Sequence, residues 1–410
     1  MARTASRRVF GLAVVFSALL LQLALQPIPA AAATNTGTLF GMNRTAVYKI
    51  DTTSGALTAF AALPPPPPTQ MLPSFNGLAS DPIGHRLFAV RSSISSDFSA
   101  QFYDLVTIDT QSAAVSVSPD MAQGAPELAY DTSANALFGI TNSCCPFQLV
   151  RIDPVTGVQT HIADLPGVQE SNMAVAPSKH AIYMSSESFV LGQFQPVVNV
   201  IAVDESTGAI TTSPALPTGA FQVAYDTSTS TLFTKSFCCP SVLLKVDPVT
   251  GVETTVPTTD LGFGSGFAMD SASHNIYMTQ DVFNSFGFFQ LLQSVNDQSG
   301  AVSVGSTQFP TGVFLQYLAF EGVAITPDSI RADVNAAQAS GAIDNAGVAS
   351  ALVAQLNAAA AARASGQCAT AANIYSAFIN AVTAQTGTHV AAATAAQLIS
   401  EAQFLIANCP

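Results

Sequence analysis

Short apolar segments alternate with polar turns along residues 35–323, and the pattern recurs about every 45–50 residues. Each copy contains an apolar segment, a polar turn, a segment with Leu-Phe or a similar pair, a loop, a third apolar segment and a turn with Gly. In the third copy, the apolar segments are residues 127–131, 136–140, 148–153 and 158–162. Four short strands in a period of this length predict the blade of a β-propeller.

The first and last copies are out of phase with the others. Residues 38–41 begin a copy that has no inner strand before it, and residues 317–321 form an inner strand that has no blade after it. Joining the two pieces completes one blade and removes the open sheet edges. We therefore predict a mainly-β fold, a six-bladed β-propeller closed by its C-terminal inner strand. A small residue suits the narrow axis of such a ring, and each predicted inner strand has Ala at its centre: Ala79, Ala129, Ala174, Ala224, Ala268 and Ala319.

A longer period lies on top of the first. Asp153 and Asp247 are separated by the same number of residues as Tyr183 and Tyr277. Blades 3–4 and 5–6 therefore read as a duplicated pair, with blades 1–2 as a more diverged third copy.

Composition changes after Pro327, where alanine dominates and the apolar spacing becomes helical. Glycine stops separate four predicted helices of a small all-α bundle, at residues 329–339, 346–363, 369–383 and 391–407. Residues 372–382, together with 339–343, 352–356 and 395–399, resemble the FIMAH-type domain of bacterial surface and secreted proteins. This resemblance implies a secreted bacterial protein with a helical accessory module and implies no catalytic residues. The propeller resembles secreted YVTN/NHL-like propellers in general pattern.

The N-terminus has the features of an export signal. Arg3, Arg7 and Arg8 precede the apolar stretch 10–25, and small residues follow at 29–33. The strongly apolar stretch favours the Sec route, and the paired arginines leave the twin-arginine route open. The expected division is a signal peptide at 1–33, the propeller at 34–323 and the FIMAH-like domain at 324–410. We expect a mature protein without a membrane span, monomeric, and secreted or held in the periplasm or cell envelope.

The formal net charge is −13, and no cluster of Lys and Arg occurs beyond the N-terminus. This excludes nucleic acid as an expected partner. Six cysteines agree with an oxidising compartment. We predict that Cys144–Cys145 and Cys238–Cys239 are vicinal disulfides and that Cys368 bonds Cys409, because antiparallel neighbouring helices bring those two ends together. A bridge between the two Cys-Cys loops, or thiolate ligation of a metal, is disfavoured because a whole blade separates the loops.

One rim of the propeller carries the inner-strand starts and the loops between second and third strands, and propellers usually place their sites there. The candidate binding residues are of two kinds, polar residues at strand starts and aromatic residues on long loops: Glu127, Asn172, Gln222 and Tyr317, and Phe98, Phe189 and Phe286. The aromatic residues either form a contact surface or fold back as a lid over the blade edges.

The enzymatic alternative places a centre at the channel mouth near Glu127. Lactonase-like propellers hold a divalent metal there with Glu, Asn and Asp, but the expected Asp is missing from this ring. His85, His180 and His274 fall at turns on the opposite rim, without a metal-binding spacing. We therefore expect no catalytic residue, metal or cofactor. The predicted function is an exported non-catalytic binding or surface-interaction protein with a protein or cell-envelope partner. The alternatives are a hydrolase or lyase and a purely architectural envelope protein.

Overall fold

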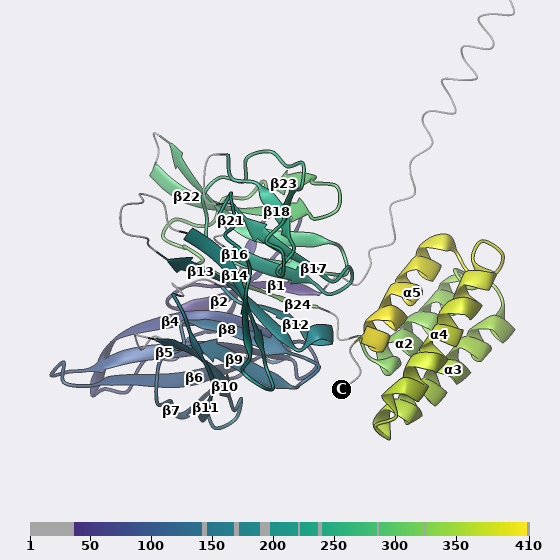
Figure 1. Cartoon of the computed structure of the whole chain (residues 1–410), viewed down its shortest axis with the longest axis horizontal. Coiled ribbons are helices and arrows are strands. Elements are labelled where there is room, and N and C mark those ends of the chain that lie inside the picture. The colour runs from purple at the N-terminus through teal and green to yellow at the C-terminus, as the bar shows by residue number, and fades with distance from the viewer. Residues whose placement is uncertain are drawn as a thin grey trace, which may run out of the picture. The chain divides into compact units, whose positions relative to one another are not determined.

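The computed structural model describes residues 37–141, 146–167, 172–188, 197–219, 222–236, 240–284, 287–322 and 325–407. Their strands form six four-stranded antiparallel sheets, and four helices follow (Figure 1). The inner strands contact one another in the closed order β24, β4, β8, β12, β16, β20 and again β24. This closed order is the six-bladed propeller that the repeat predicts.

Each blade consists of four strands, named in order from the inner strand at the axis to the outer strand. Blade 1 comprises β24(Tyr317–Glu321), β1(Thr38–Met42), β2(Ala46–Ile50) and β3(Leu57–Ala62), and blade 2 comprises β4(Gln70–Asp81), β5(Arg86–Ser95), β6(Gln101–Asp109) and β7(Val115–Asp120). Blade 3 comprises β8(Glu127–Asp131), β9(Ala136–Ile140), β10(Phe147–Ile152) and β11(Gln159–Leu165), and blade 4 comprises β12(Ala174–Ala176), β13(Ala181–Ser188), β14(Val197–Asp204) and β15(Ile210–Thr212). Blade 5 comprises β16(Gln222–Asp226), β17(Thr231–Lys235), β18(Leu243–Val246) and β19(Glu253–Thr255), and blade 6 comprises β20(Phe267–Asp270), β21(Asn275–Asn284), β22(Gly287–Asn296) and β23(Val302–Val304).

The ring closes where the phase of the repeat predicts. β24 pairs antiparallel with β1, with Thr38 opposite Glu321 and Met42 opposite Tyr317. β4 differs from expectation, because it begins at Gln70 rather than near Gly77 and contains two register shifts. The extra residues continue its pairing with β5 along a long hairpin, so blade 2 extends farther than its repeat unit indicates.

Apolar clusters lie between neighbouring blades and hold the ring together. There are six of them among the described residues, one at every seam. The central alanine of each inner strand is buried, as a narrow axis requires. At alternate seams two aromatic rings stack with centroids 5.7–5.8 Å apart: Phe88 with Tyr130, Tyr183 with Tyr225, and Tyr277 with Phe320. This alternation repeats every two blades and supports three copies of a blade pair.

The turn between third and fourth strands explains the recurring Asp and Gly. Gly55, Gly157, Gly208, Gly251 and Gly300 all have positive φ, between 67° and 78°. Each donates its backbone N–H to the carbonyl of the residue four positions earlier. In blade 2 the same place is taken by Ala113, with φ 60°. These residues shape turns, and they carry no site.

The C-terminal helices are α2(Pro327–Ser340), α3(Ala346–Ala364), α4(Cys368–Gln385) and α5(Ala392–Ala407). The Thr326 hydroxyl accepts a hydrogen bond from Ser329 N at the start of α2, and the Asn345 side chain accepts two at the start of α3. Their apolar faces bury Leu356, Tyr375 and Phe378 in one core. The predicted all-α bundle is confirmed. Among the described residues, no helix has the length and apolar character needed to cross a bilayer.

Several predictions concern residues outside the described ranges. These are the signal peptide at 1–33, the vicinal pairs Cys144–Cys145 and Cys238–Cys239, Phe189, Phe286 and Cys409. Cys368 is described, begins α4 and is disulfide-bonded. Its pairing with Cys409 stays a prediction, as do the domain limits at 33, 323 and 410.

Candidate functional site

The four predicted polar residues of the channel mouth line a single cavity of about 280 Å3. Glu127, Gln222 and Tyr317 are the first residues of β8, β16 and β24, and Asn172 precedes β12. They meet because inner strands run in the same direction around the axis, so their starts converge at one mouth. The sequence therefore predicts this grouping from the repeat alone.

The side chain of Asn172 forms hydrogen bonds with the backbone of the propeller itself. Its amide nitrogen donates to Val223 O at 2.6 Å, and its amide oxygen accepts from Val223 N at 2.9 Å. Val223 belongs to β16, so this side chain joins blade 4 to blade 5. Asn172 is thus a structural clamp, with both amide atoms engaged by one neighbouring residue.

Gln222 and Tyr317 complete the wall of the cavity. The Gln222 side chain is buried, and its amide oxygen accepts no hydrogen bond from the described part of the chain. The Tyr317 hydroxyl donates to the side-chain oxygen of Asn76 at 3.4 Å. Among the described residues that line the cavity, Glu127 supplies the single carboxylate. One carboxylate among amides is a weak set of ligands for a hard cation.

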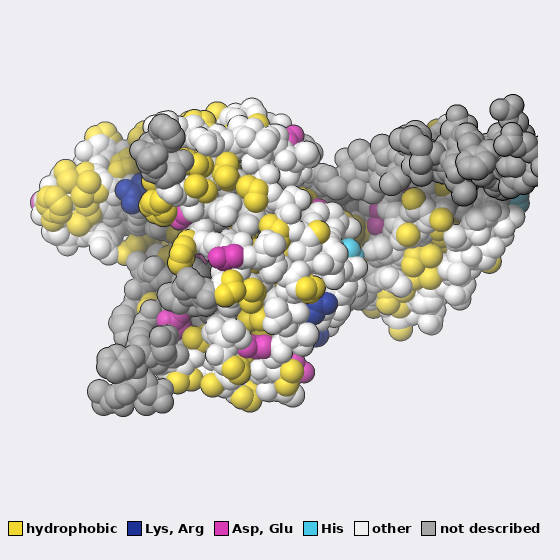
Figure 2. Space-filling view, turned by 90° about the horizontal axis from the view of Figure 1, so that it is seen from above, with side chains coloured by type: hydrophobic (Ala, Val, Ile, Leu, Met, Phe, Trp, Pro, Cys, Tyr) yellow, Lys and Arg dark blue, Asp and Glu magenta, His cyan; other side chains and the backbone are white. Residues whose placement is uncertain are grey.

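The described aromatic residues on the long loops are exposed. Phe98, at the tip of the β5–β6 hairpin, is 64% exposed, and Phe283, at the end of β21, is 74% exposed. Figure 2 shows hydrophobic side chains gathered in patches on this face, with Lys, Arg, Asp and Glu side chains between some of them. Phe189 and Phe286 lie outside the described residues, so the choice between a contact surface and a lid stays a prediction.

Blade 6 holds three of these rings in a row. Phe283 lies opposite Phe288 in the β21–β22 register, with ring centroids 4.6 Å apart. Phe288 stacks on Phe314, with centroids 4.8 Å apart. We call Phe283, Phe288 and Phe314 the aromatic stack. A cavity of about 270 Å3 lies beside it, lined by Gly287, Phe288, Phe289 and residues 308–314.

The opposite rim contains histidine–carboxylate groups that were not expected as sites from the sequence. At the seams of blades 1–2, 3–4 and 5–6, the backbone carbonyl of a histidine with φ near 50° accepts a hydrogen bond from the backbone N–H of the residue that directly follows the third strand of the same blade. The histidine also approaches an acidic side chain. The three groups are His85 with Thr110 and Glu321, His180 with Glu205 and Asp131, and His274 with Asp297 and Asp226.

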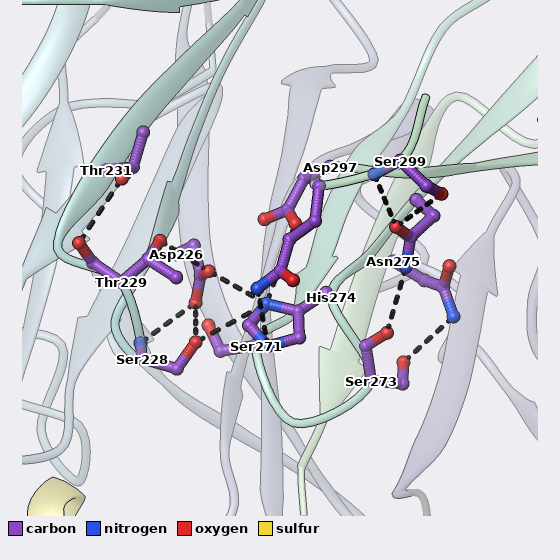
Figure 3. A network of polar contacts seen from close by, with 12 residues as sticks. Asp226, Ser228, Thr229, Thr231, Ser271, Ser273, His274, Asn275, Asp297 and Ser299 are labelled. Carbon is purple, nitrogen blue, oxygen red and sulfur yellow. Dashed lines mark hydrogen bonds and ion pairs between the residues drawn. The ribbon is translucent and has the colours of Figure 1, made fainter. Parts of the chain in front are cut away.

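The group at the seam of blades 5 and 6 is the most compact (Figure 3). His274 Nδ1 lies 3.1 Å from Asp226 Oδ2 and 3.5 Å from Asp297 Oδ1. Both carboxylates have no exposed surface, and His274 is 27% exposed. Burial and the nearby Asp226 charge raise the pKa of Asp297 to about 7. Burial also opposes ionisation of Asp226, but hydrogen bonds from Thr229 and Ser228 outweigh it and lower the pKa of that carboxyl.

A signal for these groups is present in the sequence. His85, His180 and His274 occupy the same turn in every second blade, at the spacing of the blade pair. Their acidic partners lie in other turns and on another blade, so no local motif connects them. Only the closed ring brings the three side chains together.

The helical bundle has one apolar core and clearly marked helix ends. Glycines with positive φ follow α2, α3 and α4, at the positions where the sequence predicts helix stops. The sequence over these helices matches one known domain family. Residues 327–407 are a FIMAH domain.

The propeller is similar in fold to known structures of low sequence identity. A chain in the crystal structure of a nidogen/laminin complex aligns with a TM-score of 0.51 and 12% identity, covering 70% of this chain and 99% of that one. TolB from Acinetobacter baumannii aligns with a TM-score of 0.49 and 11% identity, covering 78% of this chain and 74% of that one. The first likeness shows the propeller fold alone. No curated protein matches the chain.

The FIMAH domain has a half-buried pair of acidic residues of its own. Glu401 of α5 accepts a hydrogen bond from Gln397 at 2.9 Å, and its second carboxyl oxygen accepts none. Burial, with a contribution from nearby Asp333 of α2, raises the pKa of Glu401 to about 7. Burial also raises the pKa of Asp333. Two such groups make the stability of this domain depend on pH.

Proposed function

We propose that this chain is an exported, non-catalytic binding protein that contacts a protein or cell-envelope component through the loop-rich rim of its propeller. The exposed aromatic stack of blade 6 is the observation that carries the proposal. Aromatic side chains that stay exposed to water do not contribute the favourable free energy of apolar burial, and a partner that covers them supplies it on binding. Large aromatic residues also dominate the binding energy of protein interfaces.

The surroundings of the stack suit a contact surface. Its rings are supported by one another and by the β21–β22 hairpin, so little side-chain entropy is lost on binding. The adjacent cavity provides a recess for a side chain of the partner. Phe98 adds a further exposed aromatic residue on a loop of blade 2, at the same end of its blade.

Export and location form part of the proposal. The basic and apolar N-terminal segments 1–33 support translocation, and the cysteine pairs support an oxidising compartment. FIMAH domains occur in bacterial surface and secreted proteins, which supports a location outside the cytoplasm. We propose that the mature chain is monomeric.

The hydrolase or lyase alternative near Glu127 gains no support from the geometry. Asn172 is committed to Val223, and Glu127 is the single carboxylate among the described lining residues. A general acid and base pair, or a set of metal ligands, needs more ionisable groups than this cavity provides.

A retention assay tests the proposal. The purified mature chain is immobilised and incubated with envelope fractions and extracellular proteins of the producing bacterium. The double variant Phe283→Ser/Phe288→Ser should lose the partner that the wild type retains. Val249→Ser is the matched control, because Val249 is 79% exposed and lies in a turn between outer strands of blade 5.

Retention by the wild type and the control, with loss in the double variant, supports the proposal. Equal retention by all three proteins, or substrate turnover that Glu127→Gln abolishes, contradicts it.

A further inference from the structure

The ligand atoms of Asp226, His274 and Asp297 have the spacing of a metal site. Asp226 Oδ2 and Asp297 Oδ1 lie 3.1 and 3.5 Å from His274 Nδ1, and the ligand atoms of the three residues lie within 4.8 Å of one another. With metal–ligand bonds of about 2.0–2.1 Å, ligand atoms in a tetrahedral zinc site are about 3.3 Å apart. Both distances to Nδ1 are close to this value, and the two carboxylate oxygens are at most 4.8 Å apart.

The Asp297 side chain gives a second, independent indication that a cation binds at this site. Its side chain is wholly buried, and neither of its carboxylate oxygens accepts a hydrogen bond from the residues that the structure describes. Its nearest ionisable neighbours are His274, whose Nδ1 also faces Asp226, and Asp226 itself. Buried carboxylates without hydrogen bonds are costly unless they are paired with a cation or coordinate a metal.

The surrounding residues hold the ligands in place. Ser228 donates its backbone N–H and hydroxyl to Asp226 Oδ1. The Thr229 hydroxyl donates to Asp226 Oδ2 at 2.7 Å and fixes this oxygen 3.1 Å from His274 Nδ1. The Gln298 amide nitrogen lies 3.0 Å from His274 Nε2, on the side of the ring away from the carboxylates. On metal binding the amide turns by 180°, so that its oxygen accepts from Nε2–H and Nδ1 is left as a lone-pair donor, the usual support of a metal-bound histidine.

We propose that Asp226 Oδ2, His274 Nδ1 and Asp297 Oδ1 bind one divalent transition-metal ion of the zinc class, with water completing its coordination. Imidazole nitrogen with carboxylate oxygen suits this class of ion better than calcium or magnesium. The partial exposure of His274 supplies a path for the ion and the water. Because Asp226 belongs to β16 and the other two ligands flank strands of blade 6, the ion joins two blades.

The other two seams provide internal controls. At the seam of blades 1 and 2, Thr110 stands where blade 6 has Asp297, and its hydroxyl donates to Glu321 at 2.7 Å. At the seam of blades 3 and 4, His180 pairs directly with Glu205 at 2.9 Å. Among the described residues, three ligand atoms gather within 4.8 Å at the blade 5–6 seam alone. We therefore expect a stoichiometry of one ion per chain.

Zinc binding by the full mature chain tests the site. The untagged, chelator-stripped protein is loaded with ZnCl2, separated from free zinc by gel filtration and analysed for metal. The wild type should retain one equivalent more than Asp297→Asn or His274→Gln, and His85→Gln should retain as much as the wild type. Zinc should raise the melting temperature of the wild type by several degrees and leave that of Asp297→Asn unchanged.

Asp297→Asn keeps the shape of the side chain and removes a repelled buried charge, so it should fold, as circular dichroism will verify. If it does not fold, His274→Gln is compared with His85→Gln in its place. The proposal is overturned if the wild type retains no zinc, if it retains no more than the ligand variants, or if zinc does not change its melting temperature.

Discussion

Phe40 of β1 lies directly opposite Ala319 of β24, in the strand pair that closes the ring. Both side chains are buried in the apolar cluster between blades 1 and 2. The first and last strands of the propeller thus share one core, and the small side chain of Ala319 leaves room for Phe40.

Ala319→Leu should therefore destabilise the propeller by about 1–3 kcal/mol, the usual cost of adding methylene groups to a packed core. Urea denaturation of the full chain measures this change. Ala301→Leu, at an exposed position, is the control and should change the free energy of unfolding by less than about 0.5 kcal/mol. Similar effects at both positions would show that the closing seam is not tightly packed.

The alanine in the turn of blade 2 provides a stability test with a defined sign. Ala113 has the left-handed conformation that glycine adopts in the other five copies. Ala113→Gly should relieve roughly 1–2 kcal/mol of backbone strain. The greater chain entropy that glycine gives the unfolded state should cost about 0.5–1 kcal/mol, so we expect a net stabilisation of about 0.5–1 kcal/mol. The reverse change, Gly251→Ala, should destabilise it by at least about 0.5–1 kcal/mol, because the added Cβ would also lie 3.1 Å from Pro214 O. Thermal denaturation of both variants checks the pair, and stabilisation by Gly251→Ala would refute the reasoning.

The FIMAH domain should lose stability as the pH rises through the acidic range. Burial raises the pKa of Glu401 from 4.5 to about 7, so between these values the folded domain binds more protons than the unfolded chain. The free energy of unfolding therefore falls from about pH 4.5 to about pH 7 and then levels off. Glu401→Gln should flatten this slope and be more stable than the wild type at neutral pH. Urea titrations followed by the helical circular dichroism signal measure it, and an unchanged slope in the variant would contradict the assignment.

The hydrogen bonds of Asn172 that join blades 4 and 5 should contribute to stability, whereas Gln222 at the same cavity should not. Asn172→Ala removes both hydrogen bonds to Val223 and should destabilise the propeller by about 1–3 kcal/mol. Gln222→Met, at the same cavity, replaces an amide whose oxygen accepts no hydrogen bond and should be neutral or stabilising. Chemical denaturation of the two variants measures the difference. If Asn172→Ala is as stable as the wild type, the clamp carries little free energy.

The repeat made the fold predictable from the sequence. Apolar strands of constant spacing indicated six blades, and the phase difference between residues 38–41 and 317–321 indicated the closing pair. Gly341, Gly366 and Gly387 marked the helix ends because only glycine adopts their positive φ at low cost. The extension of β4 back to Gln70 was not predictable, because the proline-rich segment before it has no strand pattern.

The candidate sites were predictable only in part. Glu127, Gln222 and Tyr317 share a mouth because strand starts converge, which the repeat implies. Asp226, His274 and Asp297 come from separate turns on two blades, and their distances follow from how the blades pack. No metal was expected from the sequence, because these ligands do not form a motif of closely spaced residues along the chain.

Photo-crosslinking from the aromatic stack is the most direct test of the proposed binding function. p-Benzoylphenylalanine is placed at position 283 or 288, or at position 249 as the control, and cells secreting each protein are irradiated. We predict one shared adduct from positions 283 and 288 and none from position 249. No adduct from the stack, or the same adduct from position 249, would contradict the claim that this rim contacts a partner.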